Sequence, residues 1–92
     1  MKFEWDRQKA KANIAKHGVS FERAKAVFAD ELAIIEPDND ATEERWRIMG
    51  LAEGVLIFVA YTEREIEGEQ IIRLISARQP TRAERKRYEE ES

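Results

Sequence analysis

The residues of this sequence most suited to chemistry are arginines that gather toward its C-terminal end. Arg73 lies within an apolar segment, Arg78 lies at its end, and Arg82, Arg85 and Lys86 follow closely. The planar guanidinium group of arginine can hold two phosphate oxygens at once, and its charge does not titrate near neutral pH. Arg82 also falls in the predicted first turn of a helix, a place that favours anions. The series therefore predicts a site for phosphate groups.

Residues near the N-terminal end could complete such a site. Lys9, Asn13 and Lys16 are spaced so that they share one face of a predicted helix, and His17, the single histidine, follows them. RNA cleavage without a metal ion needs a base for the 2′-hydroxyl, cations for the charge that grows on phosphorus, and an acid for the leaving oxygen. Histidine has a reference pKa of about 6.5, so a histidine at this position could move a proton. At the end of a helix beside a glycine it is also typical of a structural cap.

The net charge of −3 conceals two basic blocks on either side of an acidic middle. Residues 1–17 carry five Lys or Arg against two Asp or Glu, and residues 71–88 carry six against one. Residues 18–70 carry five against thirteen, and three glutamates follow at the end of the chain. If the basic blocks meet in space, they form a positive patch that the total charge hides. We interpret the acidic middle as a bystander surface that favours solubility.

Length and composition favour one soluble, cytosolic domain over residues 1–92. A chain of this size has a modest core. The lack of cysteine excludes disulfides and thiolate metal sites, and one histidine excludes a multi-histidine cluster, so we expect no metal or other cofactor. No apolar segment approaches the roughly 20 residues of a membrane span. The first residues lack the apolar core of a signal peptide.

Helix signals dominate the first third of the chain. Residues 2–5 are expected to form a short edge strand. Asp6 and Gly18 are the predicted N-cap and stop of a first helix, and Ser20 is the predicted N-cap of a second. The apolar stripe of that second helix comprises Phe21, Ala24, Val27 and Phe28.

Strand signals dominate the remainder. Strands are expected over residues 32–36, 45–51, 55–62 and 70–77, and polar loops over residues 37–43 and 63–68. Pro80 ends the last strand, and a capping box from Thr81 to Glu84 begins a final helix. The pattern is a strand, two helices, three or four strands and a final helix. The short connections predict an α+β fold, in the order β-α-α-β-β-β-α, with an antiparallel sheet and helices packed on one face.

The predicted final helix lacks an apolar stripe. Ala83 and Tyr88 are its apolar residues, and they do not share a face. A helix rich in Arg, Lys and Glu is usually solvated, so this one is either mobile or held by something other than an apolar face.

Four segments resemble the BrnT family of toxins. The pattern W-D-x-x-K-x-x-x-N-x-x-K-H-G-V-S-F, from Trp5 to Phe21, resembles the opening of that family, and A-x-x-V-F-x-D continues it. VLIFVAYTER and IRLISARQPTRAERKRYE, at residues 55–64 and 72–89, resemble its centre and end. The resemblance spans nearly the whole chain. One departure is Gln79-Pro80, where the family often has a Lys-Ala type pair.

This resemblance implies a toxin of a bacterial type II toxin–antitoxin system. It implies a RelE-like fold, metal-independent ribonuclease activity that arrests translation, and neutralisation by a BrnA antitoxin whose DNA-binding part lets the complex repress its operon. The positions that match the family pattern are Lys9, Asn13, Lys16, His17, Arg64, Arg73, Ser76, Arg78, Arg82, Glu84, Arg85 and Tyr88.

The residues and the resemblance together define a predicted site. The predicted catalytic residues are Arg64, Arg73, Arg78 and His17. The predicted RNA-binding residues are Lys9, Lys16, Arg82, Arg85, Lys86 and Tyr88. Two alternatives stay open: a module that binds nucleic acid or protein without turnover, and a basic cluster that only docks an acidic partner.

Overall fold

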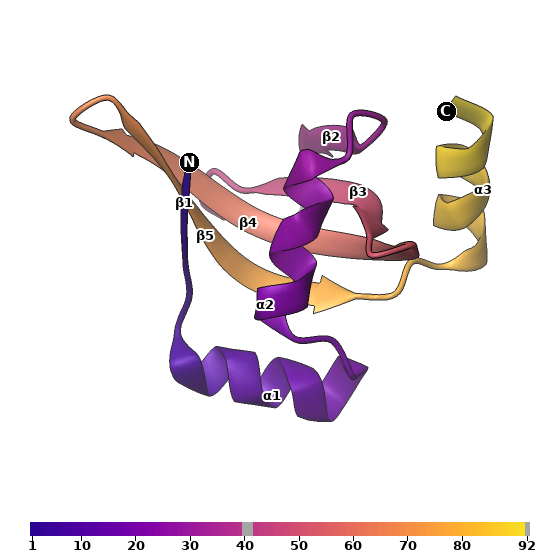
Figure 1. The fold of residues 1–92 in the computed structure, drawn as a ribbon, viewed down its shortest axis with the longest axis horizontal. Helices are drawn as coiled ribbons and strands as arrows, with labels where there is room; N and C mark the ends of the chain where they lie inside the picture. Colours follow the sequence, from indigo (N-terminus) through magenta and orange to yellow (C-terminus); the bar gives the residue numbers. More distant parts are fainter. Residues whose placement is uncertain (40–41, 92) are drawn as a thin grey trace.

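The computed structural model describes residues 1–39 and 42–91, whose strands form one five-stranded sheet in the order β1-β5-β4-β3-β2 (Figure 1). The strands are β1 (Lys2–Glu4), β2 (Ile34–Pro37), β3 (Trp46–Ala52), β4 (Val55–Ile66) and β5 (Glu69–Arg78). The helices are α1 (Arg7–His17), α2 (Phe21–Ala24), the 3₁₀ helix η1 (Lys25–Ala29) and α3 (Arg82–Glu91). The predicted α+β class is confirmed, but four strands follow α1, α2 and η1, where the predicted order β-α-α-β-β-β-α has three. Among the described residues, no helix has the length and apolar character needed to cross a membrane.

The prediction of a wholly antiparallel sheet is wrong for one strand. β1 runs parallel to β5, with Lys2 opposite Ile71 and Glu4 opposite Arg73, while every other pair is antiparallel. The turn residues of a hairpin predict an antiparallel strand pair from the sequence. A parallel pair between the two ends of a chain is not marked by any local sequence pattern. The sheet is therefore mixed, and its first and last strands are neighbours.

The predicted N-caps of the first two helices and the predicted stop of the first are confirmed. The Asp6 carboxylate accepts hydrogen bonds from the backbone N–H groups of Gln8 and Lys9 at 2.8 and 3.1 Å, and Gly18 ends α1 with a φ of 70°. The Ser20 hydroxyl accepts from the Arg23 N–H at 3.1 Å. α1 therefore has fixed ends, which determine the side chains that it turns toward the sheet.

The core lies between α2, η1 and one face of the sheet, here called the α2 face. Figure 1 shows α2 and η1 crossing the sheet as one continuous coil. Phe21, Ala24 and Val27 are at most 1% exposed, as the predicted apolar stripe requires. They pack in one cluster with sheet residues that include Ile48, Ile57, Val59, Ile72 and Leu74.

The polar loop predicted over residues 63–68 is wrong. β4 continues to Ile66 and β5 begins at Glu69, so only a tight turn joins them. Glu67 and Gly68 have φ values of 51° and 80°, as two-residue turns of a hairpin require. The charged composition was misleading because this end of the hairpin is largely exposed. The loop predicted over residues 37–43 includes residues 40–41, which lie outside the described residues.

A bulge in β5 brings two arginines to the same face. Arg73 and Arg78 are an odd number of residues apart, which in a regular strand would place them on opposite faces. The pairing of β5 with β4 shifts at Ile75, so that Arg73 lies opposite Thr62 and Arg78 opposite Phe58. Both arginines thus lie on the face opposite the α2 face, here called the α3 face.

α3 packs on this second face, which contradicts the prediction that all helices cover one face. Tyr88 is 7% exposed and packs with Met49 and Leu56. Its hydroxyl donates a hydrogen bond to Asp30 at 2.5 Å. Burial tends to raise the pKa of Asp30, but hydrogen bonds from Tyr88 and from the Leu51 and Leu32 backbone hold that pKa below its ordinary value. One buried aromatic residue thus replaces the missing apolar stripe.

Ion pairs add to the attachment of α3. The Arg78 guanidinium donates to both carboxylate oxygens of Glu84, at 2.8 and 3.1 Å. The Arg87 guanidinium donates to both oxygens of Glu36, at 3.0 and 2.6 Å. The predicted capping box is confirmed, because the Thr81 N–H donates to Glu84 and the Glu84 N–H donates to Thr81. α3 is therefore held by one ring and several charged groups.

Asn13 closes the open edge of β5. β1 pairs with β5 only as far as Arg73. At Ala77, the outer edge of β5 therefore has no pairing with β1. The Asn13 amide accepts from the Ala77 N–H at 3.1 Å and donates to the Ala77 and Val19 carbonyls at 2.7 and 2.9 Å. Asn13 is 6% exposed. It therefore fixes α1 beside the C-terminal half of β5.

We expect Asn13→Ala to lower the free energy of unfolding by about 2–4 kcal/mol, because three buried backbone groups lose their partner. Urea denaturation of the wild type and the variant measures this change. Lys11→Ala, at an exposed position of the same helix, is the control and should change stability by less than about 0.5 kcal/mol. Equal stability of the two variants would contradict the role given to Asn13.

The Arg78–Glu84 pair predicts a pH dependence of stability. Hydrogen bonds from Arg78 lower the pKa of Glu84 from 4.5 to about 2. The carboxyl group of Glu84 therefore binds a proton at higher pH in the unfolded chain than in the folded chain. The contribution of the ionised group to the free energy of unfolding is complete above pH 4.5 and is lost as the pH falls toward 2. We expect Glu84→Gln to destabilise by about 2 kcal/mol at pH 7 and by little near pH 2. Thermal unfolding across this pH range measures the difference in stability, with Glu89→Gln as the exposed control. If the difference between the wild type and Glu84→Gln did not change with pH, the role given to Glu84 would be contradicted.

Candidate functional site

A cavity of about 210 Å³ lies between α1 and β5. It is lined by Lys9, Lys16 and His17 from α1 and by Ile75 and Ser76 from β5, with Ala12 and Asn13 between them. The predicted shared face of Lys9 and Lys16 is confirmed by this placement. Because Asn13 holds α1 against Ala77, three of the five ionisable side chains of the helix border the cavity beside the strand.

Two further predicted residues meet at one carboxylate. Glu4 of β1 accepts from the Arg64 guanidinium at 2.8 and 3.4 Å and from the Arg73 guanidinium at 2.7 Å. The hydrogen bond from Arg64, followed by that from Arg73, lowers the pKa of Glu4. The side chains of Arg64 and Arg73 remain 48% and 43% exposed. Glu4 therefore orients two guanidinium groups that still face solvent.

Arg78 has a different environment. Its guanidinium carbon lies 4.1 Å from the centre of the Phe58 ring, and both of its terminal nitrogens contact Glu84. The hydrogen bond to Glu84 raises the pKa of Arg78. The side chain is 34% exposed, less than those of Arg64 and Arg73. Arg78 is thus held firmly but is largely engaged by its own chain.

These groups form one surface that follows β5. Arg73 and Arg78 stand on either side of Ile75 and Ser76, the two strand residues that line the α1–β5 cavity. Their cross-strand partners Thr62 and Phe58 are four positions apart in β4, which corresponds to about 13 Å. We call the set Lys9, Lys16, His17, Arg64, Arg73 and Arg78 the basic strip. It draws on both of the basic blocks in the sequence.

The other predicted residues lie apart from the basic strip or in its continuation. Arg82 follows Arg78 in the exposed first turn of α3. Arg85 and Lys86 are exposed on α3, and the Lys86 ammonium lies 4.0 Å from Glu90. The ring of Tyr88 is buried against the sheet and is not presented for stacking with a base. We therefore leave Tyr88 out of the proposed RNA-binding set and give it a packing role.

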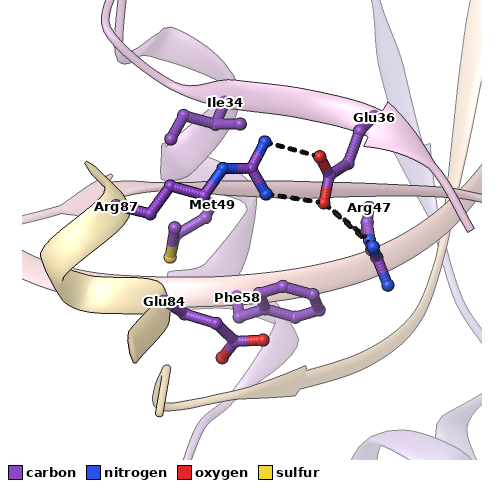
Figure 2. Close-up of a pocket in the computed structure, with 7 residues that line it drawn as sticks. All are labelled: Ile34, Glu36, Arg47, Met49, Phe58, Glu84 and Arg87. Atoms are coloured by element: carbon purple, nitrogen blue, oxygen red, sulfur yellow. Dashed lines mark hydrogen bonds and ion pairs between the residues drawn. The ribbon is translucent and has the colours of Figure 1, made fainter. Parts of the chain in front are cut away.

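A second small cavity, of about 100 Å³, lies under α3 (Figure 2). Figure 2 shows Glu36 between the guanidinium groups of Arg47 and Arg87, with Glu84 across the cavity. Hydrogen bonding from Arg87 is the main reason that the pKa of Glu36 is lowered. This arrangement positions α3 on the sheet rather than offering free cations.

The carboxylates that hold these arginines were missed in the sequence. Glu4 is separated from its partners by most of the chain length, so no local pattern connects them. Glu36 had a usable signal, because it lies directly opposite Arg47 on neighbouring strands. Glu84 was assigned only to the capping box, yet it also binds Arg78.

One comparison with known proteins identifies a family for this chain. A family model described as the ribonuclease toxin BrnT of type II toxin–antitoxin systems matches residues 5–84 of the 92. The matched range contains the whole basic strip and Arg82. A comparison with curated proteins finds no match. Since the family model covers most of the sequence, this chain belongs to the BrnT family of ribonuclease toxins, a family that implies an RNA substrate and an antitoxin partner.

Proposed function

We propose that this chain is an endoribonuclease that cleaves RNA at the basic strip without a metal ion. One observation carries the proposal: Lys9, Lys16 and His17 share a cavity with Ser76, and Arg73 and Arg78 stand on either side of it in the same strand. Cations and a proton-transfer group, the components that metal-free cleavage requires, are thereby adjacent.

The arginines bind the RNA backbone. A guanidinium group has five N–H donors, and Glu4 engages only part of those on Arg64 and Arg73. The remaining donors are free to contact phosphate oxygens. Because Glu4 already restricts the rotation of the two arginine side chains, binding of RNA loses less side-chain entropy. Lys9 and Lys16 add positive charge at the cavity, and Arg82 extends the surface along α3. This accounts for the predicted RNA-binding residues other than Arg85, Lys86 and Tyr88.

The reaction follows from the groups at the cavity. The 2′-oxygen of one nucleotide attacks the neighbouring phosphorus as His17 accepts the hydroxyl proton. The bond from phosphorus to the 5′-oxygen breaks, and that oxygen receives a proton from an acid such as a lysine ammonium. The products are a 2′,3′-cyclic phosphate and a 5′-hydroxyl. Arg73 and the two lysines stabilise the charge on the phosphoryl oxygens.

The cellular consequence is arrest of translation in the bacterial cytoplasm, with neutralisation by an antitoxin of the BrnA type. DNA would be contacted only through that antitoxin. The RelE-like arrangement of strands and helices belongs to the same proposal. It is supported by membership of the BrnT family.

A second candidate function is RNA binding without turnover. It is favoured by the pairing of Arg78 with Glu84, which neutralises one of the cations that would stabilise the transition state. The two candidates differ in a product that can be measured, because only the first yields a cyclic phosphate.

We expect Arg73→Ala and His17→Ala to slow cleavage of an RNA oligonucleotide by about 10²-fold or more, since each removes a group that acts in the transition state. Arg73→Ala should also weaken RNA binding, whereas His17→Ala should change binding little. Arg23→Ala, an exposed arginine on α2, is the matched control and should keep full activity. If RNA binding falls in Arg73→Ala but wild-type protein never cleaves, the binding-module reading is correct.

We further expect cleavage to continue unchanged after the protein is stripped with EDTA and assayed in its presence. The proposed steps use only side chains of the chain, so removal of divalent ions leaves the reaction path intact. Product analysis should show cyclic phosphate ends with and without the chelator. Loss of activity that is restored by adding Mg²⁺ or Mn²⁺ would refute the metal-free mechanism.

A further inference from the structure

An apolar groove of about 300 Å³ opens on the α2 face, beyond the end of η1. Its apolar lining comprises Phe28, Ile35, Trp46, Ile48, Tyr61 and Ile72, with Met1 at its margin. Ile35 and Met1 are 56% and 58% exposed, and Leu32, between lining residues 31 and 33, is 57% exposed. Large apolar side chains left this open on one face mark an interaction surface more often than an ordinary exterior.

The margin of this apolar groove is acidic. Asp30, Glu31 and Glu63 line it, and among its described lining residues none is lysine or arginine. Glu63 and Gln70 also line an adjoining cavity with Glu44 and Glu65. Part of the acidic middle of the chain therefore lies beside apolar surface, which a surface built only for solubility does not require.

The apolar groove and the basic strip lie on opposite faces of the sheet. Ile48 and Ile72 point to the α2 face, whereas Arg73 and Arg78 lie on the α3 face. The two surfaces approach each other at one place, because Arg64 lines the adjoining cavity together with Glu63 and Gln70. A chain seated in the groove can continue past Glu63 to the Arg64 end of the strip.

We propose that the apolar groove is the docking site of the antitoxin, and that the docking segment carries apolar side chains flanked by lysine or arginine. The proposal deepens the proposed function and rests on it for the identity of the partner. Apolar residues of the segment fill the groove, and its cations pair with Glu31 and Glu63. A segment rich in carboxylates would be repelled by the same margin. Affinity arises in the groove, and RNA is excluded where the segment reaches Arg64.

The test uses the full toxin and the antitoxin encoded in its operon. Ile35→Asp places a charge in the groove, and Glu31→Lys reverses a charge at its margin; neither residue belongs to the basic strip. We expect each variant to cleave RNA and slow growth like the wild type, but to bind the purified antitoxin at least about tenfold more weakly and to escape neutralisation in cells. Ile66→Asp, at an exposed apolar position of the β4–β5 hairpin, should be neutralised normally.

The outcomes separate the two proposals. If both groove variants bind antitoxin as tightly as the wild type does, the docking inference is overturned. It is also overturned if a short RNA displaces the antitoxin while Ile35→Asp leaves its affinity unchanged, since the antitoxin would then occupy the basic strip with acidic groups. If the wild type neither cleaves RNA nor slows growth, the proposed function fails, and the affinities of the groove variants still decide where the antitoxin binds.

Discussion

The structure depends on the way in which Asn13 satisfies the edge of β5. β1 is too short to pair with the whole of that strand, and an unpaired buried backbone is costly. One amide side chain supplies both a donor and an acceptor to Ala77, in the manner of a neighbouring strand. The same bonds orient α1, so Lys9, Lys16 and His17 face β5. The contact of Asn13 with Ala77 therefore pairs the buried backbone and also orients the side chains that α1 contributes to the basic strip.

A few carboxylates determine where the arginines of this acidic chain point. Glu4 holds Arg64 and Arg73, while Glu84 and Glu36 hold the arginines around α3. The ion pairs of the more exposed Arg64 and Arg73 contribute little to stability, so their main effect is orientation, whereas the less exposed Arg78–Glu84 pair also stabilises the fold. The arginines of these pairs also differ in how many N–H donors they keep for a ligand. Arg64 and Arg73 share one carboxylate and keep donors for a ligand, whereas Arg78 has a carboxylate of its own.

Local patterns were predictable and long-range ones were not. Asp6, Gly18 and Ser20 marked helix ends because capping depends on neighbours a few residues away. The apolar stripe of α2 and η1 was likewise visible. The parallel pairing of β1, the bulge at Ile75 and the contact of α3 with the second face depend on residues far apart in sequence. Charge counts predicted that both chain ends contribute cations to the site, but not the carboxylates between them.

The adjacency of the first and last strands has a consequence for biosynthesis. β1 is synthesised well before β5 and cannot pair with it until β5 has been made, so most of this domain must be synthesised before the strip can close. Contacts this distant in sequence also slow folding. A nascent chain that lacks β5 consequently lacks the assembled basic strip. The pairing of β1 with β5 therefore makes formation of the basic strip a late event in the synthesis of this domain.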